Sequence, residues 1–143
     1  MPQNTFNSKY MKHFKNLSLL LLCTVMSLSF TACSKDDEPK FDYDINQIVG
    51  TWVVTDVNLG SGYVSWFMER TSATFNANGT YSGRGYFGYG NGTYKAEGKT
   101  IITYIGGKEY LRYDVIRLSG NTCELRMYQT GSDADIMLKC RKE

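Results

Sequence analysis

Histidine is almost absent from this 143-residue sequence, because the only imidazole is that of His13, in a segment that we expect to be removed. The rest of the chain therefore lacks the side chain that most often acts as a general base at neutral pH or as a metal ligand. Nucleophile pairs of the Ser–His or Cys–His type and histidine metal sites are excluded there. We expect a protein that is not an enzyme and that has no metal or cofactor.

A hydrophobic run long enough to cross a membrane is also missing. The uncharged run from Leu17 to Phe30 is shorter than the roughly 20 apolar residues that a spanning helix needs. Three lysines precede the run and small residues end it, which is the three-part layout of a secretory signal. We predict that residues 1–32 are a signal peptide, with Met11 as an alternative start.

The residue after this signal is a cysteine. Thr31-Ala32-Cys33 resembles the lipobox of bacterial lipoproteins, and this resemblance implies that the Cys33 thiol carries a diacylglycerol and becomes the acylated N-terminus. Two or more acyl chains make membrane anchoring stable, because each buried methylene contributes about 0.8 kcal/mol. The alternative is a plain signal peptide followed by an incidental cysteine.

An acidic run follows the cysteine. Lys35, Asp36, Asp37 and Glu38 resemble the export signal of Bacteroidetes lipoproteins, which implies display on the outer face of the outer membrane. Charged residues and proline also disfavour packing, so residues 33–42 are predicted to be a lipidated acidic tether in either case. The expected partners are the membrane, through the N-terminal lipid, and a small molecule or a surface protein.

An excess of positive charge is absent from the predicted mature chain. Residues 1–32 contain three of the 16 Lys and Arg residues and none of the 14 acidic ones, so their removal changes the formal charge from +2 to −1. No basic field remains to attract a polyanion. We therefore expect no nucleic-acid partner.

Helical periodicity of useful length is lacking from residues 43–143, which are predicted to form one domain. Asp44 is a candidate cap for a single helical turn before Gly50. Short runs rich in β-branched and aromatic residues alternate instead with Gly, Asn and Asp clusters, which is typical of strands and turns. These runs are residues 51–57, 63–69, 72–76, 80–86, 92–96, 100–105, 109–118, 122–129 and 134–141. We predict an all-β fold, a small antiparallel up-and-down barrel of about eight strands, with a β-sandwich as the alternative.

The last two runs predict a hairpin whose register can be stated. With a four-residue loop at 130–133, one face carries the facing pairs Met127 and Ile136, Leu125 and Leu138, and Cys123 and Cys140, while charged residues occupy the other face. Cys123 and Cys140 then lie opposite each other. They are predicted to be either a disulfide, as an oxidising exterior allows, or two buried thiols.

Residues 79–94 are rich in Gly and Tyr but contain a single arginine, Arg84, so an RNA-binding tract is not indicated. Tyr81, Phe87 and Tyr89 share one parity with glycines between them. Glycine in a strand allows a sharp bend or the close approach of a ring. We interpret this segment as a barrel corner.

Gly50-Thr51-Trp52 begins the first predicted strand, and "FNANGTY" and "GTYKAEGKTI" follow as hairpins. This layout resembles the small lipocalin-like domains of Bacteroidetes lipoproteins. The resemblance implies a barrel whose base is closed by Trp52, with an arginine from the last strand, Arg141, packed over the ring. It also implies a binding function.

An eight-stranded barrel holds either its own side chains or one small ligand. Candidate ligand-binding residues are those predicted to point inward, together with one carboxylate at the mouth: Trp52, Phe75, Tyr81, Tyr94, Tyr113, Met127 and Asp56. We expect a non-catalytic binding module for a small apolar or aromatic molecule or a sugar. The alternative is a filled barrel whose loops bind another protein.

The lipidation hypothesis predicts that Cys33→Ala abolishes incorporation of labelled palmitate when the chain is expressed in a Gram-negative host. The predicted processing attaches every acyl chain to Cys33, so parent protein should carry label and the variant none. Equal labelling of the two proteins would contradict the assignment.

Overall fold

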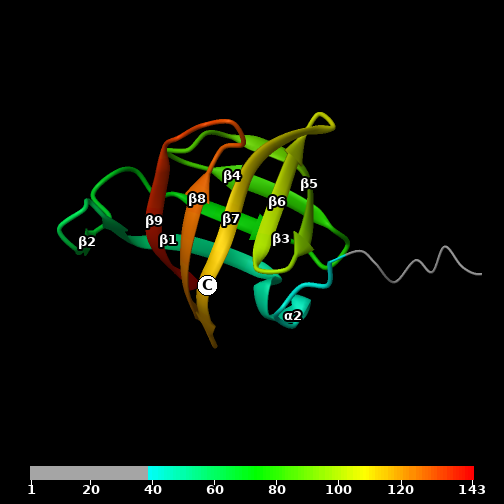
Figure 1. Ribbon diagram of the computed structural model, residues 1–143, viewed down its shortest axis with the longest axis horizontal. Coiled ribbons are helices and arrows are strands. Elements are labelled where there is room, and N and C mark those ends of the chain that lie inside the picture. Colours follow the sequence, from blue (N-terminus) through cyan, green and yellow to red (C-terminus); the bar gives the residue numbers. More distant parts are fainter. Residues whose placement is uncertain (1–38) are drawn as a thin grey trace, which may run out of the picture. The chain divides into compact units, whose positions relative to one another are not determined.

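The computed structural model describes residues 39–143, which form an all-β domain with one helical turn (Figure 1). Among these residues, no helix is long and apolar enough to span a membrane. The elements are α2 (Ile45–Ile48), β1 (Gly50–Asn58), β2 (Tyr63–Ser65), β3 (Ser72–Phe75), β4 (Thr80–Arg84), β5 (Gly90–Glu97), β6 (Thr100–Ile105), β7 (Lys108–Ser119), β8 (Thr122–Tyr128) and β9 (Asp135–Lys142).

The sheet closes into a barrel of eight antiparallel strands. From β3 to β9 each strand pairs with the next one in sequence, and β1 pairs with both β3 and β9. The short strand β2 lies outside this ring and pairs only with the far end of β1, where it projects from the barrel (Figure 1). The predicted up-and-down barrel is confirmed. The sandwich alternative is wrong, because β1 pairs with β9, whereas a sandwich would leave these two strands as unpaired sheet edges.

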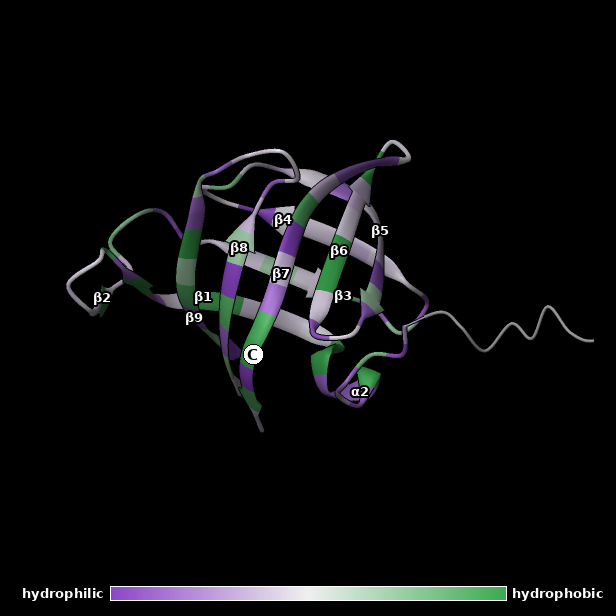
Figure 2. Cartoon of the chain, viewed as in Figure 1, coloured by the Kyte–Doolittle hydropathy of each residue, from purple (hydrophilic) through white to green (hydrophobic). Residues whose placement is uncertain are grey.

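Alternation along the strands separates the core from the surface. Hydrophobic and hydrophilic residues alternate along β7 and β8 (Figure 2), as expected for strands with one face in water. The buried core consists of Ile48, Trp52, Val54, Val57, Phe75, Tyr81, Tyr94, Ile101, Tyr113, Val115, Cys123, Leu125, Met127, Leu138 and Cys140. Every residue predicted to point inward is in this cluster or, in the case of Ile136, packs against it.

The register of the β8–β9 hairpin is confirmed. Cys123 pairs with Cys140, Leu125 with Leu138, and Met127 with Ile136. The loop is longer than predicted, because pairing stops at Tyr128 and Asp135. The loop residues 129–134 include a backbone hydrogen bond from Ser132 to the Gln129 carbonyl, which turns the chain before the strands meet.

One end of the barrel is closed by α2, the element that precedes β1. Asp44 caps this turn as predicted, with its Oδ1 accepting a hydrogen bond from the Asn46 backbone N–H. The indole of Trp52 donates to the carbonyl of Ile48 over 2.8 Å, which ties α2 to β1. We call this the closed end.

The cation over the Trp52 ring is a lysine, so the expectation that Arg141 packs there is wrong. Lys142 Nζ lies 5.1 Å from the ring centroid and donates to the Gln47 carbonyl. Arg141 pairs with Val53 and is exposed, because neighbouring residues of a strand point to opposite faces.

Among the described residues, Lys40 already contacts the barrel, although it lies inside the segment predicted to be a tether. The Asp42 N–H donates to the Gly98 carbonyl, and the Gly98 N–H donates to the Lys40 carbonyl. The predicted signal peptide, Cys33 and the acidic run lie outside the described residues. The chain therefore reaches the barrel beside the β5–β6 turn.

The confirmed register predicts unequal effects of truncation on β9. Leu138 is 1% exposed, so Leu138→Ala should lower the free energy of unfolding by about 2–5 kcal/mol. The exposed side chain of Arg141 serves as the control, and Arg141→Ala should change it by less than about 0.5 kcal/mol. Denaturant unfolding curves measure both values. A larger loss for Arg141→Ala would contradict the register.

Candidate functional site

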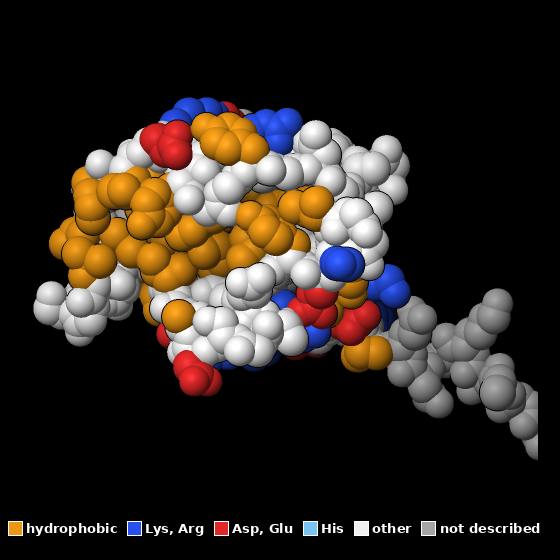
Figure 3. Space-filling model, turned by 90° about the horizontal axis from the view of Figure 1, so that it is seen from above, with side chains coloured by type: hydrophobic (Ala, Val, Ile, Leu, Met, Phe, Trp, Pro, Cys, Tyr) orange, Lys and Arg blue, Asp and Glu red, His pale blue; other side chains and the backbone are white. Residues whose placement is uncertain are grey.

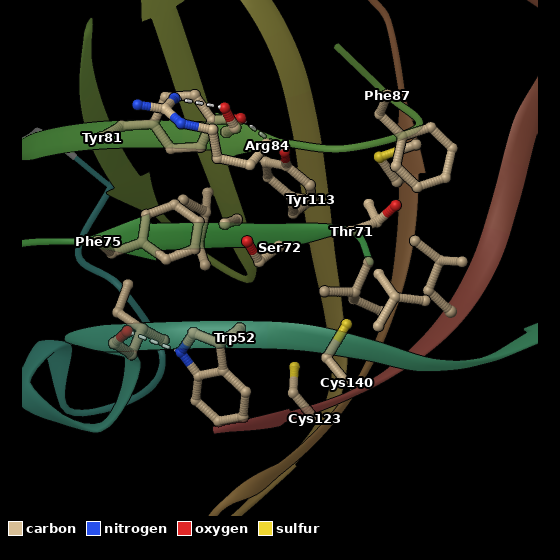
Figure 4. Close-up of a pocket in the computed structure, with 18 of the residues that line it drawn as sticks. Trp52, Thr71, Ser72, Phe75, Tyr81, Arg84, Phe87, Tyr113, Cys123 and Cys140 are labelled. Carbon is tan, nitrogen blue, oxygen red and sulfur yellow. Dashed lines mark hydrogen bonds between the residues drawn. The ribbon is translucent and has the colours of Figure 1, made fainter. Parts of the chain in front are cut away.

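The barrel interior contains an apolar cavity of about 50 Å³ (Figure 4). That volume is room for a few water molecules or a small group, since one water needs roughly 10–15 Å³ by this measure. Five of the predicted ligand-binding residues line the cavity: Trp52, Phe75, Tyr81, Tyr113 and Met127. Bulky rings fill most of the remaining interior.

Tyr94 is buried as predicted but does not line the cavity. Its ring packs against Phe75 with centroids 5.1 Å apart, and its hydroxyl donates to the Asn76 carbonyl over 2.9 Å. The residue therefore fastens the β3–β4 turn to β5. Tyr94 lies away from the cavity although it points inward, because inward parity does not specify the height of a side chain within the barrel.

Asp56, predicted as a carboxylate of the ligand site, does not line the cavity. The register of β1 against β9 shifts between Val54 and Asp56, so Thr55 is an extra residue in the strand. The shift places Val57 in the core and turns Asp56 to the outer face, where its carboxylate accepts a hydrogen bond from the Thr55 hydroxyl.

Tyr81 and Tyr113 bring two hydroxyls together inside the barrel. The oxygens are 3.2 Å apart, and the residues are 3% and 7% exposed. Burial raises the pKa of both phenols, that of Tyr113 most strongly, so both remain protonated at physiological pH. Gly83 provides the space for the Tyr81 hydroxyl, because a methyl group at that position would collide with the oxygen.

The end of the cavity remote from α2 is bordered by four aromatic residues, Trp66, Phe67, Tyr86 and Phe87, which we call the mouth cluster. The Trp66 ring centroid lies 5.7 Å from that of Tyr86 and 5.6 Å from that of Phe87. Phe87 also lines the cavity. Phe67 and Tyr86 are 67% and 53% exposed, and Figure 3 shows a broad apolar surface extending toward the side that carries β2.

Most of the mouth cluster was not identified from the sequence. Residues 63–69 and 80–86 were read as strands, whereas β2 ends at Ser65 and β4 at Arg84, so Trp66 and Tyr86 belong to loops. The signal that distinguishes them is three consecutive large apolar residues, 66–68, which break strand alternation. The barrel-corner interpretation of residues 79–94 is wrong, because the segment is a hairpin in which β4 pairs antiparallel with β5. Tyr81 is buried as its parity suggests, whereas Tyr89 is 71% exposed and lies outside the core.

Thr71 joins the two loops that carry the mouth cluster. Its buried hydroxyl donates to the Glu69 carbonyl and accepts from the Tyr86 N–H over 3.0 Å. Gly85 permits this approach, because its φ is +100° and an added Cβ would meet the backbone of Arg70 and Thr71. Thr71 and Gly85 therefore help to hold the two loops together, in addition to the hydrogen bonds from the Trp66 N–H to the Thr55 carbonyl and from the Tyr110 hydroxyl to the Phe87 carbonyl.

Cys123 and Cys140 are free, buried thiols on directly paired residues, and both line the cavity. The thiol alternative is thus the one present in this structure. Burial raises the pKa of Cys123 to about 12 and raises the pKa of Cys140 as well. Because the thiolate is the reactive form, both side chains are inert near neutral pH and act as small apolar groups.

Carboxylates do not enter the cavity. Glu109 pairs with Arg112, whose hydrogen bonds lower the pKa of the glutamate to about 2, and Asp114 pairs with Arg126 over 2.7 Å. Within residues 39–143, no group of three or more His, Cys, Asp or Glu side chains is arranged to hold a metal ion. The interior therefore presents rings, hydroxyls and thiols.

A closed antiparallel barrel with an apolar interior and an aromatic mouth defines a class of small domains suited to holding an apolar molecule. The family model described as a lipocalin-like domain matches residues 48–125, and the chain belongs to this family. The matched region runs from the end of α2 into β8. No curated protein and no solved structure matches the chain.

The packing of the mouth loops predicts that Gly85→Ala destabilises the protein more than Gly131→Ala. Both glycines have positive φ, but only at Gly85 does an added Cβ meet backbone, whereas nothing lies within 4 Å at Gly131. In both variants the alanine must adopt a positive φ, which destabilises the folded state. In Gly85→Ala the added Cβ also displaces the Arg70–Thr71 backbone, which should lower the free energy of unfolding by about 1–3 kcal/mol more. Denaturant unfolding followed by tryptophan fluorescence measures the difference. Equal losses would show that the loops do not depend on this contact.

Proposed function

We propose that this protein is a non-catalytic binding module that holds a small apolar or aromatic molecule at the mouth of its barrel. The observation that carries the proposal is the continuity between the mouth cluster and the cavity, through Phe87, which belongs to both. Aromatic walls with a few convergent hydroxyls are the usual lining of small-molecule sites. Membership of the lipocalin-like family supports the same conclusion.

The size of the cavity limits what it holds without rearrangement. Pockets for drug-sized molecules occupy roughly 300–1,000 Å³, far more than the 50 Å³ found here. A ligand of ordinary size would insert only part of its structure and would lie against the mouth cluster with the remainder. The rings of Trp66 and Tyr86 are placed to cover that part.

The proposed location is the cell surface, with the chain anchored in the outer membrane by a lipid on Cys33. Residues 40–42 meet the barrel at the β5–β6 turn. The turn α2 closes the end of the barrel at which β1 begins, and the mouth lies at the opposite end. Such an anchor, of the type that Bacteroidetes lipoproteins carry, would hold the closed end toward the membrane. The mouth would then face outward, open to molecules in the surroundings.

A second candidate function is protein binding through the mouth cluster. Exposed Phe67 and Tyr86 favour it, because aromatic residues are enriched at the cores of protein interfaces. The small cavity favours it as well. A small molecule inside the barrel would support the first function, and an empty barrel would support protein binding.

The proposal that a ligand occupies the barrel interior predicts that Ala73→Leu abolishes retention of that ligand. Ala73 lines the cavity, so a larger side chain there fills it, whereas Ala96 packs against the core elsewhere and Ala96→Leu provides the matched control. Native mass spectrometry of protein purified from its natural host should find a bound small molecule on the parent and on Ala96→Leu, but not on Ala73→Leu. An empty parent protein would favour the second candidate.

A further inference from the structure

The buried tyrosine pair has more hydrogen-bonding capacity than the barrel uses. The two hydroxyls of Tyr81 and Tyr113 carry two hydrogens, and the single bond between them employs one. Within residues 39–143, neither oxygen forms any other hydrogen bond to protein. One O–H group, on one tyrosine or the other, therefore remains without an acceptor. Buried donors are rarely left in this state, because the loss of water is not compensated.

The unused donor faces the cavity. Both tyrosines line it, and in Figure 4 their rings lie on the same side as Phe75, across from Trp52. Gly83 makes room for the Tyr81 hydroxyl at this level of the barrel. The unused donor thus belongs to one of two residues that line an interior space in which another molecule can lie.

The charges around the cavity indicate what kind of acceptor fits. Arg84 is the charged residue that lines it, and its guanidinium already donates to the carbonyls of Gly83 and Gly90 and to the side chain of Asn91. A buried carboxylate would lose its hydration without gaining an unengaged cation, which is costly. A neutral oxygen avoids that cost.

We infer that the ligand carries a neutral hydrogen-bond acceptor, a carbonyl or ether oxygen, on an apolar body, and that the Tyr81–Tyr113 pair donates a hydrogen bond to it. The inference rests on the proposed function and specifies the ligand class. Tyr81 and Tyr113 are then the residues that determine specificity, while the surrounding rings supply affinity without discrimination.

The test uses two probes of the same shape, cyclopentanone and methylenecyclopentane, in which an oxygen replaces a CH₂ group. Their dissociation constants for the complete chain are measured by NMR titration. The variant is the double substitution Tyr81→Phe/Tyr113→Phe, because removal of one hydroxyl would leave the other free to donate. Loss of both partners also leaves no buried hydroxyl unpaired. Tyr94→Phe is the matched control, since this buried tyrosine donates elsewhere.

We expect the ratio of ketone affinity to alkene affinity to fall about tenfold in the double variant and to stay within about twofold of the parent in Tyr94→Phe. Comparison of this ratio between a variant and the parent cancels the different hydration of the two probes. Binding of both probes with an unchanged ratio would overturn the inference alone and assign the free donor to a water molecule. Failure of both probes to bind the parent would overturn the proposed function, and the inference with it.

A measurement on the parent protein covers the case in which the double variant does not fold. The infrared C=O stretch of bound cyclopentanone should lie at lower frequency than in cyclohexane, because a hydrogen bond weakens the carbonyl bond. A stretch at the cyclohexane position would overturn the inference.

Discussion

The pairing of β1 with β9 is the constraint on which the rest of this structure depends. It joins the two ends of the sheet, so that side chains of one parity are enclosed on all sides. The first half of β1 also pairs with β3 and its second half with β2, and the extra residue at Thr55 lies where these partners change. A bulge bends a strand and increases its twist, which closure of a small barrel requires.

Closure places packing and binding in competition for the same space. An eight-stranded barrel has an interior just wide enough for its own side chains, and here Trp52, Phe75 and Tyr113 take most of it. The cavity that remains is lined mainly by strand residues, and Phe87 is the large ring that borders it from the mouth loops. At the closed end, α2, Trp52 and Lys142 are joined by hydrogen bonds and a cation–π contact. At the mouth, the loops meet through Thr71 and Gly85.

The candidate site was predictable where it depends on alternation within a strand. Trp52, Phe75 and Tyr81 follow the period of two, and their inward direction was correctly predicted. Asp56 obeys the same parity and was nevertheless misplaced, because the bulge before it is a response to β9, a strand more than 80 residues away in the chain. Trp66 and Tyr86 were read as strand residues, since loops that meet through side chains leave no periodic signal.

The sequence by itself indicated most of the strands, the all-β antiparallel class and the register of the last hairpin, because each follows from local alternation and from a turn between neighbours. Closure into a barrel rather than a sandwich was decided by the pairing of β1 with β9. Short motifs such as Gly50-Thr51-Trp52 suggested a lipocalin-like domain, and the family model matches residues 48–125. Only the tertiary structure decided that Lys142 and not Arg141 covers that ring, that Tyr113 but not Tyr94 reaches the cavity, and that four aromatic residues from two loops border the mouth. These features depend on the stagger between strands when the barrel closes, which is a relation among distant segments that no local pattern records.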